Sequence, residues 1–308
     1  MADRDRRVLA GALISMSRPS QVLLIVVVYF AGVAAARASG AIDLQAIVIG
    51  LAALSLVSAS VHFVNEYADA ETDAATRRTA FSGGSGALSR TGLDRRVALH
   101  AALASAVAGL SLGVLGALSG ALPPIAFGLL VAGTVGGWAY SLPRSVALNR
   151  HGLGEIGNAI LGGLLLPVYG FAAASGSMPA WVIAAFLPFA LVDLASVLAT
   201  AWPDRKADDA SGKRTLVTRI SPKLSRVIHA ASLAAATVVM AVATGRAIPS
   251  TVALASLVVV PTALIATMRI TSTESPLWSV ATMVGLIVAM LLGWLLVPSG
   301  SWPAGVTA

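Results

Sequence analysis

Apolar residues dominate the chain in long runs, and short polar stretches separate one run from the next. A run of roughly 20 apolar residues is long enough to cross a bilayer as a helix. The breaks are rich in Gly, Ser and Pro, as in "ASGSMP" and "TSTESP", which are turn and helix-stop residues. The pattern predicts nine membrane-spanning helices, at about residues 20–37, 41–64, 97–118, 121–140, 154–175, 179–201, 226–245, 248–268 and 276–297.

Composition strengthens this interpretation. Of the 308 residues, 57% are hydrophobic and 11% are charged, whereas soluble domains carry about 25% charged residues. We therefore expect an all-α, polytopic membrane protein with its nine helices around a central cavity, forming one domain over residues 1–308. Cysteine is absent, which excludes disulfides, thiolate metal sites and a cysteine nucleophile.

The net charge of +7 could suggest a nucleic-acid partner, but the placement of the basic residues argues against one. They concentrate between the apolar runs, above all in three longer polar connections, at about 65–96, 141–153 and 202–225. With a cytoplasmic N-terminus, nineteen of the twenty-one Lys and Arg residues fall inside, leaving Arg37 and Arg246 outside. The positive-inside rule therefore predicts a multi-pass protein of the cell membrane, with its N-terminus cytoplasmic and its C-terminus outside.

The N-terminal stretch also has the basic flank and apolar core of a signal peptide. Arg18 and Pro19 interrupt that segment, and the next apolar run is long enough to span, so we expect an uncleaved first helix. Acidic segments follow the second and sixth spans, which indicates a four-helix period. We expect two four-helix repeats plus a ninth helix.

Two acidic motifs lie at predicted ends of spans. Asn65, Asp69 and Asp73 are spaced i, i+4, i+8, and Asp204 and Asp208 are spaced i, i+4. On a helix such residues share one face. A single cluster is readily explained as solvated surface charge. Two clusters with the same spacing on the same predicted membrane face favour a shared site, and oxygen-only ligands suit Mg²⁺ together with substrate phosphates.

Basic pairs follow each acidic motif by a few residues, Arg77–Arg78 after the first and Lys213–Arg214 after the second. Guanidinium and ammonium groups bind diphosphate oxygens well. The positive-inside rule explains the same pairs without any ligand. Both explanations stay open at this point.

The motifs together carry a resemblance to a known family. "NEYADAETD" (65–73) followed by "RRT", "DRKADDASGKRTL" (204–216), "SRPSQ" (17–21) and "YSLPRSVALNRHGLGE" (140–155) resemble signatures of the UbiA family of intramembrane prenyltransferases. Their order and spacing agree over essentially the whole chain. The resemblance implies a single transmembrane prenyltransferase domain over residues 1–308.

The resemblance also implies roles for particular residues. The carboxylates that would bind Mg²⁺ and, through it, the diphosphate are Asp69, Asp73, Asp204 and Asp208, with Asn65 assisting. The side chains that would contact diphosphate oxygens are those of Arg18, Arg78, Lys213 and Arg214. Tyr140 and Ser141 would lie near the reacting carbon or the acceptor. Family members ionise an allylic isoprenyl diphosphate, and a nucleophilic carbon attacks the resulting cation.

Several functions remain compatible with the sequence. The favoured acceptor is lipophilic and aromatic, a quinone precursor like 1,4-dihydroxy-2-naphthoate; a glycerol-phosphate lipid or a carotenoid is the alternative. A transporter or a non-catalytic membrane subunit would also explain intramembrane acids. A transporter needs its ion site near the midplane, whereas these acids lie at helix ends, which favours the enzyme. Prenyl chain length and oligomeric state stay open.

Three features depart from this picture or stay ambiguous. Asp209 stands where many relatives have Arg, which weakens a phosphate role there. The Phe81–Gly86 loop, "FSGGSG", could cradle phosphate through backbone N–H groups or serve as a flexible connection. Asp193 lies inside the sixth predicted span, where it could orient a polar acceptor or stay neutral beside a helix backbone.

Overall fold

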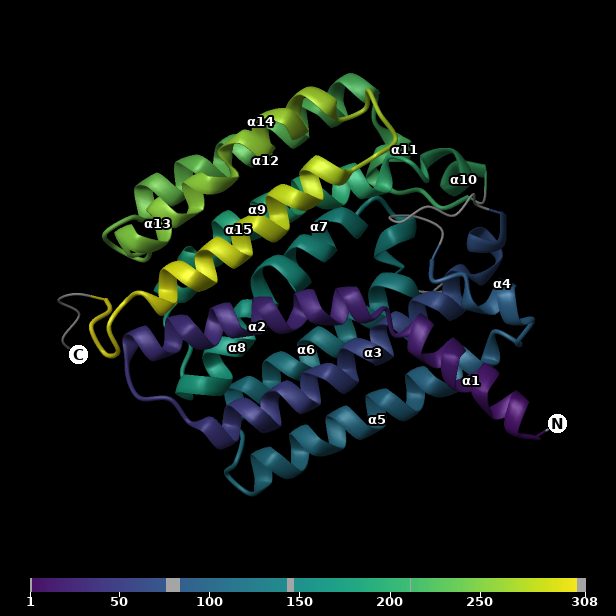
Figure 1. The fold of residues 1–308 in the computed structure, drawn as a ribbon, viewed down its shortest axis with the longest axis horizontal. Coiled ribbons are helices and arrows are strands. Elements are labelled where there is room, and N and C mark those ends of the chain that lie inside the picture. Colours follow the sequence, from purple (N-terminus) through teal and green to yellow (C-terminus); the bar gives the residue numbers. More distant parts are fainter. Residues whose placement is uncertain (1, 76–83, 143–146, 211, 304–308) are drawn as a thin grey trace.

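A computed structural model describes residues 2–75, 84–142, 147–210 and 212–303 of the chain (Figure 1). The structure is 80% helical, and no strand forms within those ranges. The elements in chain order are α1 (Ala2–Met16), α2 (Pro19–Ser39), α3 (Leu44–Ala75), α4 (Ala87–Thr91), α5 (Arg96–Leu118), α6 (Pro124–Ser141), η1 (Leu148–Arg150), α7 (Gly154–Asn158), η2 (Ala159–Leu165), α8 (Leu166–Ser175), α9 (Ala180–Ala201), α10 (Arg205–Ala210), α11 (Leu216–Arg219), α12 (Pro222–Ala243), α13 (Ser250–Ser256), η3 (Leu257–Val259), α14 (Val260–Arg269) and α15 (Leu277–Leu295).

The nine predicted spans are confirmed within the described part of the chain. Nine helical segments there are long and apolar enough to cross a membrane. Two of them are continuous in direction but change helix type: α7, η2 and α8 together cover Gly154–Ser175, and α13, η3 and α14 cover Ser250–Arg269. The four-helix repeat and the orientation of the termini stay predictions.

Helix α3 is longer than its apolar run. The predicted span ends at residue 64, but the helix continues to Ala75 and carries the first acidic motif on its last three turns. The sequence "NEYADAETDAA" contains no Gly or Pro and is rich in Ala and Glu, so it continues a helix readily. The first part of the predicted connection 65–96 is therefore helical.

Close helix crossings occur at small residues, as is usual in membrane bundles. Helices α2 and α8 cross so that Gly32 lies directly against the Pro167 carbonyl and Gly170 against the Tyr29 carbonyl; a Cβ at either glycine would collide with backbone. Tyr29 and Tyr169 are buried beside this crossing, and their hydroxyls donate to carbonyl oxygens of α3. This packing fixes α2 and α8 against α3, the helix that carries the first motif.

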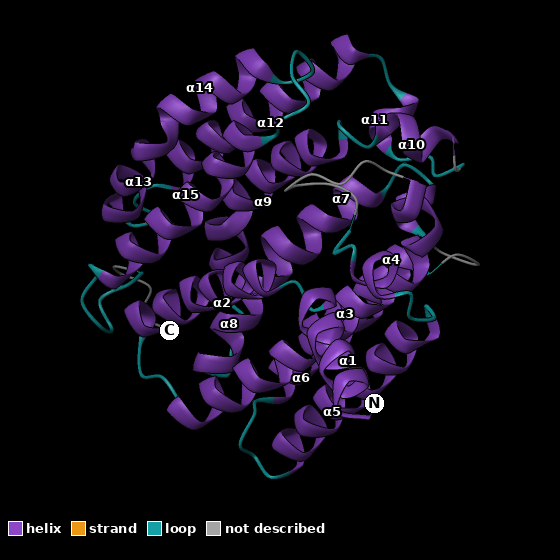
Figure 2. Cartoon of the chain, turned by 45° about the vertical axis from the view of Figure 1, so that its right-hand side comes forward, coloured by secondary structure: helices purple, strands orange, loops and turns teal. Residues whose placement is uncertain are grey.

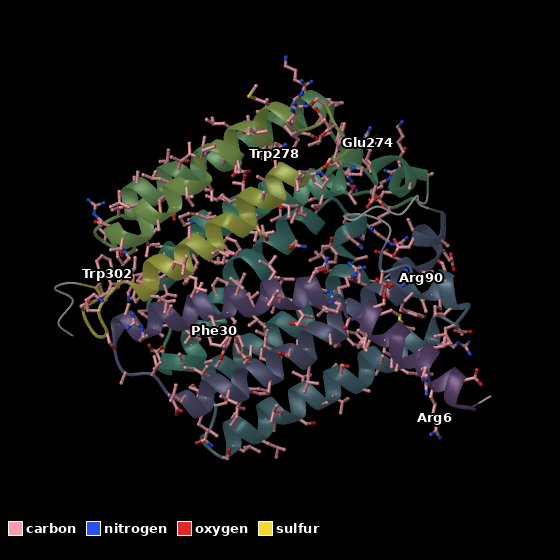
Figure 3. All side chains as sticks on the ribbon, viewed as in Figure 1. Arg6, Phe30, Arg90, Glu274, Trp278 and Trp302 are labelled. Carbon is pink, nitrogen blue, oxygen red and sulfur yellow. The ribbon has the colours of Figure 1, made fainter. Side chains whose placement is uncertain are left out.

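The short helices gather at one end of the molecule, which we call the polar end: α1, α4, α10 and α11 (Figures 1 and 2). In Figure 3 the labelled Arg6, Arg90 and Glu274 lie toward this end, whereas Trp302 lies at the opposite end. These helices lie outside the nine predicted spans, and α1 precedes the first of them. Its Ala12 and Met16 pack against Phe63 and Val64 of α3, so α1 covers the helix next to the acidic motif.

Candidate active site

The two acidic motifs meet around one side chain. Asp69 extends from α3 and Asp208 from α10, and the Lys213 ammonium lies between them. Lys213 Nζ is 3.3 Å from Asp69 Oδ2 and 3.6 Å from Asp208 Oδ1. All three side chains are at least 85% buried. Motifs far apart in the sequence thus contact the same cation, as expected for a shared site.

Local backbone geometry places Lys213. Helix α10 ends soon after Asp208, and Gly212 has a φ of +73°, a left-handed conformation that L side chains disfavour. The Lys213 N–H then donates to the Asp208 carbonyl at 2.8 Å, so the chain folds back over α10. Asp204 lies one turn before Asp208, with the Asp208 N–H bonded to the Asp204 carbonyl at 2.9 Å. The motif and its lysine form one compact unit.

Asn65 connects Asp69 to two other predicted site residues. In the amide orientation that satisfies its neighbours, Asn65 Nδ2 donates to Asp69 Oδ2 at 3.2 Å and to Ser141 Oγ at 3.1 Å. Asn65 Oδ1 then accepts from Arg18 Nη2 at 3.1 Å. Ser141 is the last residue of α6 and is 1% exposed. The structure therefore brings residues of α3, α6 and the α1–α2 junction together.

Glu66 is the residue that the sequence reasoning missed. It is 3% exposed and accepts from Arg18 Nη2 at 2.7 Å and from Nε at 3.2 Å. It also accepts from the Ser85 N–H at 2.9 Å and the Ser85 hydroxyl at 2.6 Å. Its position directly after Asn65 in the motif was the available signal.

Arg18 is held by its backbone as well as by this ion pair. Its φ of 52° is left-handed, which is uncommon for a residue other than Gly, Asn or Asp. Pro19 follows as the first residue of α2. This turn directs the Arg18 side chain from the α1–α2 junction toward α3.

Asp73 lies one turn beyond Asp69, toward the polar end. Its carboxylate rests against Gly84, whose φ is +60°, and a Cβ at Gly84 would overlap an oxygen of Asp73. The same Cβ position is 3.4 Å from Glu66 Oε1. The second half of the "FSGGSG" loop therefore closes over the acidic face of α3. Phe81, Ser82 and Gly83 lie outside the described residues.

Burial and neighbouring charges shift the pKa values of Asp208 and Lys213, which lie outside the spanning segments. Burial raises the pKa of Asp208 to about 6; Lys213 opposes this shift, while Asp204 and Asp69 add to it. Burial alone would lower the pKa of Lys213, but Asp69, Asp208 and the Tyr140 hydroxyl outweigh it, so the pKa lies well above its ordinary value. Lys213 is thus a permanent cation. Tyr140, half-buried at the end of α6, lies within its electrostatic reach.

The donor set fits Mg²⁺ better than a transition metal. Asp69 Oδ1 is buried and has no hydrogen-bond partner in the part of the chain that the structure describes, which leaves this oxygen available to a metal ion. Among the described residues, no three Asp, Glu, His or Cys side chains form a ready-made metal cage. Mg²⁺ does not require one, since it keeps several waters and binds through one or two carboxylates plus substrate phosphates.

Other charged residues are not brought into this network. Arg214 and Asp209 are exposed, and Glu71 is exposed in an ion pair with Arg95, its Oε1 2.8 Å from Nη1. Arg78, predicted to contact diphosphate, lies outside the described residues, as does Arg77. The predicted roles of Arg78 and Arg214 stay predictions.

Glu155 links helix α7 to helix α11. It lies in the first turn of α7 and is 3% exposed, and its Oε1 accepts from the N–H groups of Leu216 at 2.9 Å and Val217 at 3.4 Å. These are the first N–H groups of α11, which otherwise have no partner within that helix. Glu155 therefore holds the segment that follows Lys213 against the start of the fifth span.

An open groove of about 420 Å³ lies on the outer face of the bundle between α5 and α6. Its lining is almost entirely apolar and includes Leu110, Val135, Trp138 and Leu142. The last two flank Tyr140 and Ser141 in the sequence. The groove contains none of the carboxylates of the acidic network and neither Tyr140 nor Ser141.

These features define the class: an all-α, multi-pass membrane protein with an acidic–basic site at its polar end. The sequence model of the UbiA prenyltransferase family matches residues 24–278, and the chain belongs to that family. Members of the family are prenyltransferases, so the protein is an enzyme of that class. No curated protein matches the sequence.

Solved structures agree with this fold. A UbiA homolog from Archaeoglobus fulgidus bound to DMAPP and Mg²⁺ is similar with a TM-score of 0.71 and 17% identity, covering 92% of this chain and 98% of that one. The structure of that homolog bound to GPP and Mg²⁺ has a TM-score of 0.70 and 17% identity, and the match covers 92% of this chain and 99% of that one. A structure described for digeranylgeranylglyceryl phosphate synthase has a TM-score of 0.64 and 14% identity, and the match covers 93% of this chain and 99% of that one. At these identities the likeness shows the fold alone.

Proposed function

We propose that this protein transfers a prenyl group from an isoprenyl diphosphate to a lipophilic acceptor in a Mg²⁺-dependent reaction. The observation that carries the proposal is the shared contact of Asp69 and Asp208 with the Lys213 ammonium, at 3.3 and 3.6 Å. Carboxylates of both motifs converge on one cation position. The similar Archaeoglobus fulgidus structures bound to GPP or DMAPP with Mg²⁺ support the same assignment. Family membership favours this enzyme over a transporter.

Each part of the site has a role in this chemistry. Asp69, Asp73, Asp204 and Asp208 would hold Mg²⁺, which when bound supplies positive charge that neutralises the departing diphosphate. Lys213 and Arg18 add fixed positive charge on the same face of α3. Glu66 keeps Arg18 in place through two hydrogen bonds.

The reaction then proceeds by ionisation. The C–O bond of the allylic diphosphate breaks and its electron pair leaves on the diphosphate oxygen. A ring carbon of an aromatic acceptor donates a π pair to the allylic carbon, and loss of the proton from that ring carbon restores aromaticity. Ser141 is buried and Tyr140 is half-buried, and these surroundings limit the access of water that would otherwise capture the allylic cation.

For the acceptor, we favour an aromatic quinone precursor resembling 1,4-dihydroxy-2-naphthoate. The basis is the likeness of "GKRTL" (212–216) to family members that prenylate this acid. Its alternative, a glycerol-phosphate lipid, gains support from the similar digeranylgeranylglyceryl phosphate synthase structure. A carotenoid acceptor is the third possibility. The apolar groove between α5 and α6 suits any acceptor that approaches through the bilayer.

The test uses purified protein with geranylgeranyl diphosphate and a panel containing these three acceptor types, with products identified by mass spectrometry. We expect one prenylated product, its loss in EDTA and its return with Mg²⁺. Turnover in excess chelator would contradict the proposed mechanism. The prenylated member of the panel identifies the acceptor class.

Matched variants separate the site from nearby surface acids. Asp69→Ala and Asp208→Ala should abolish transfer. Glu71→Ala and Asp209→Ala remove exposed acids from the same two motifs and should leave it unchanged. Retained turnover in both Asp69→Ala and Asp208→Ala would refute a shared metal–diphosphate site.

A further inference from the structure

Asp193 is a buried acid that the proposed transfer reaction does not use. It lies in α9 and is 7% exposed, and it is the only charged residue in that spanning helix. Its Oδ2 is fully enclosed and has no hydrogen-bond partner among the described residues. An acid in that setting is expensive unless something satisfies it, and intramembrane acids mark substrate or ion pathways.

The wall opposite Asp193 has an unusual backbone. Residues Ala159–Leu165 form the π-helix η2, in which the Leu166 N–H bonds to the Leu161 carbonyl five residues back. Such π segments are rare and often lie at functional sites. Helix η2 packs on α9 with Gly163 so close to Ala190 that a Cβ would lie 2.6 Å from its Cα. This tight contact sets the position of Asp193 relative to η2.

Gly162 lies between Asp193 and a second polar side chain, that of Asn158. A Cβ at Gly162 would lie 3.6 Å from Asp193 Oδ2 and 3.4 Å from Asn158 Oδ1, which is ordinary contact distance. The carboxylate and the amide oxygen therefore flank the same point and are at most 7.0 Å apart, the sum of those distances. Asn158 is half-buried.

The chemistry of this pair suits a hydroxyl group. Asp193 Oδ2 and Asn158 Oδ1 are the atoms that face this point, and both accept hydrogen bonds, so the pair suits a hydroxyl, which donates one and can accept another. A prenyl chain is a hydrocarbon and offers neither function. Of the two substrates, the acceptor is the one that can carry such a hydroxyl. Asp193 lies eight residues before the end of α9 at Ala201, roughly 12 Å along the axis, so the pair lies on the membrane side of the motif acids.

We propose that Asp193 and Asn158 form the binding site for a hydroxyl group of the acceptor and orient its attacking atom toward the diphosphate end. This inference rests on the proposed prenyl transfer. Asp193 binds the acceptor and takes no part in breaking the diphosphate bond. Its loss should therefore weaken acceptor use while leaving donor binding intact.

The test compares Asp193→Leu, which removes the polar group, with Asp193→Asn, which keeps its shape and hydrogen-bonding capacity. Ser256→Ala is the control; it removes a buried hydroxyl in α13 that bonds to the Val252 carbonyl of its own helix. The assay measures kcat/KM for 1,4-dihydroxy-2-naphthoate with geranylgeranyl diphosphate. Geranylgeranylglyceryl phosphate is the probe if the aromatic acid is not a substrate. Thermal shift with geranylgeranyl diphosphate and Mg²⁺ reports donor binding separately.

We expect Asp193→Leu to lower acceptor kcat/KM at least about tenfold, the size expected for a lost hydrogen bond to a charged group. Asp193→Asn should stay within about threefold, and the donor-induced shift should not change in either variant. A wild-type kcat/KM in Asp193→Leu, or a parallel loss of the donor shift, would overturn the proposal. Absence of a donor shift in the wild type would instead refute the proposed function.

A second comparison identifies the hydroxyl. Monomethyl ethers of the aromatic acid remove one hydroxyl donor at a time. The ether at the contacting position should reduce kcat/KM in the wild type and have little further effect in Asp193→Leu. Equal losses in both proteins for every ether would also overturn the proposal.

Discussion

Replacing Lys213 by Met tests how the site is held together. The ammonium lies 3.3 Å from Asp69 and 3.6 Å from Asp208, and both carboxylates are 7% exposed. At an effective dielectric constant of about 20, each pair at this separation attracts by about 5 kcal/mol before desolvation costs. Removing one partner of a buried ion pair typically costs roughly 3–5 kcal/mol, because a charge is left uncompensated. We expect Lys213→Met to lose stability of that order.

Divalent cations should reverse much of this loss. In EDTA the two carboxylates of Lys213→Met repel each other, whereas bound Mg²⁺ supplies the missing positive charge between them. Mg²⁺ should therefore stabilise Lys213→Met more than the wild type. The assay is thermal unfolding in detergent, followed by the fluorescence of the six tryptophans with EDTA or MgCl₂.

Lys206→Met provides the control, because Lys206 is an exposed lysine on α10, the helix that carries Asp208. It should unfold like the wild type under both conditions. Equal stability of Lys213→Met and wild type in EDTA would refute the electrostatic reasoning. An identical Mg²⁺ response in the two proteins would refute the idea that Mg²⁺ can replace the charge of the missing ammonium.

Three further predictions concern groups around Lys213. Glu66→Gln should raise the donor KM about tenfold or more, as expected when Arg18 loses a buried charged partner; steady-state kinetics measures it. The pKa of Asp208 is raised to about 6, so below that pH a proton must leave before a cation binds. Mg²⁺ affinity should therefore fall as the pH drops below about 6. Titrating Mg²⁺ against the thermal shift at two pH values measures this affinity, with Asp208→Asn as the reference. Glu155→Gln weakens the acceptor of the Leu216 N–H and should cost about 1 kcal/mol of unfolding free energy.

The spans were predictable because length and hydropathy almost determine a membrane helix. The ends of these helices were harder to predict. Polar residues end an apolar run without ending the helix, and α3 continues to Ala75 for that reason. Helix α1 contains only fifteen residues and is too polar to span, so a search for apolar runs passes over it. Its contacts with α3 depend on tertiary packing.

The acidic residues of the candidate site were predictable from the sequence, but the contacts that Lys213 and Glu66 make were not. The i, i+4 spacing places Asp69 and Asp73 on one face of a helix whatever else surrounds them. No local rule indicates that Lys213, rather than Arg214, turns inward; the left-handed Gly212 and the fold-back onto α10 decide that. Glu66 was missed because its partners, Arg18 and Ser85, come from other parts of the chain.

The position of Lys213 also explains how the site can exist before any substrate arrives. Two buried carboxylates from different helices would otherwise push α3 and α10 apart. An ammonium placed between them by the same loop that carries the second motif offsets the repulsion. The sequence "DDASGKRTL" thus contributes both the second set of acids and the charge that lets them face the first. The spacing from Asp208 to Lys213 is therefore a structural requirement of the site.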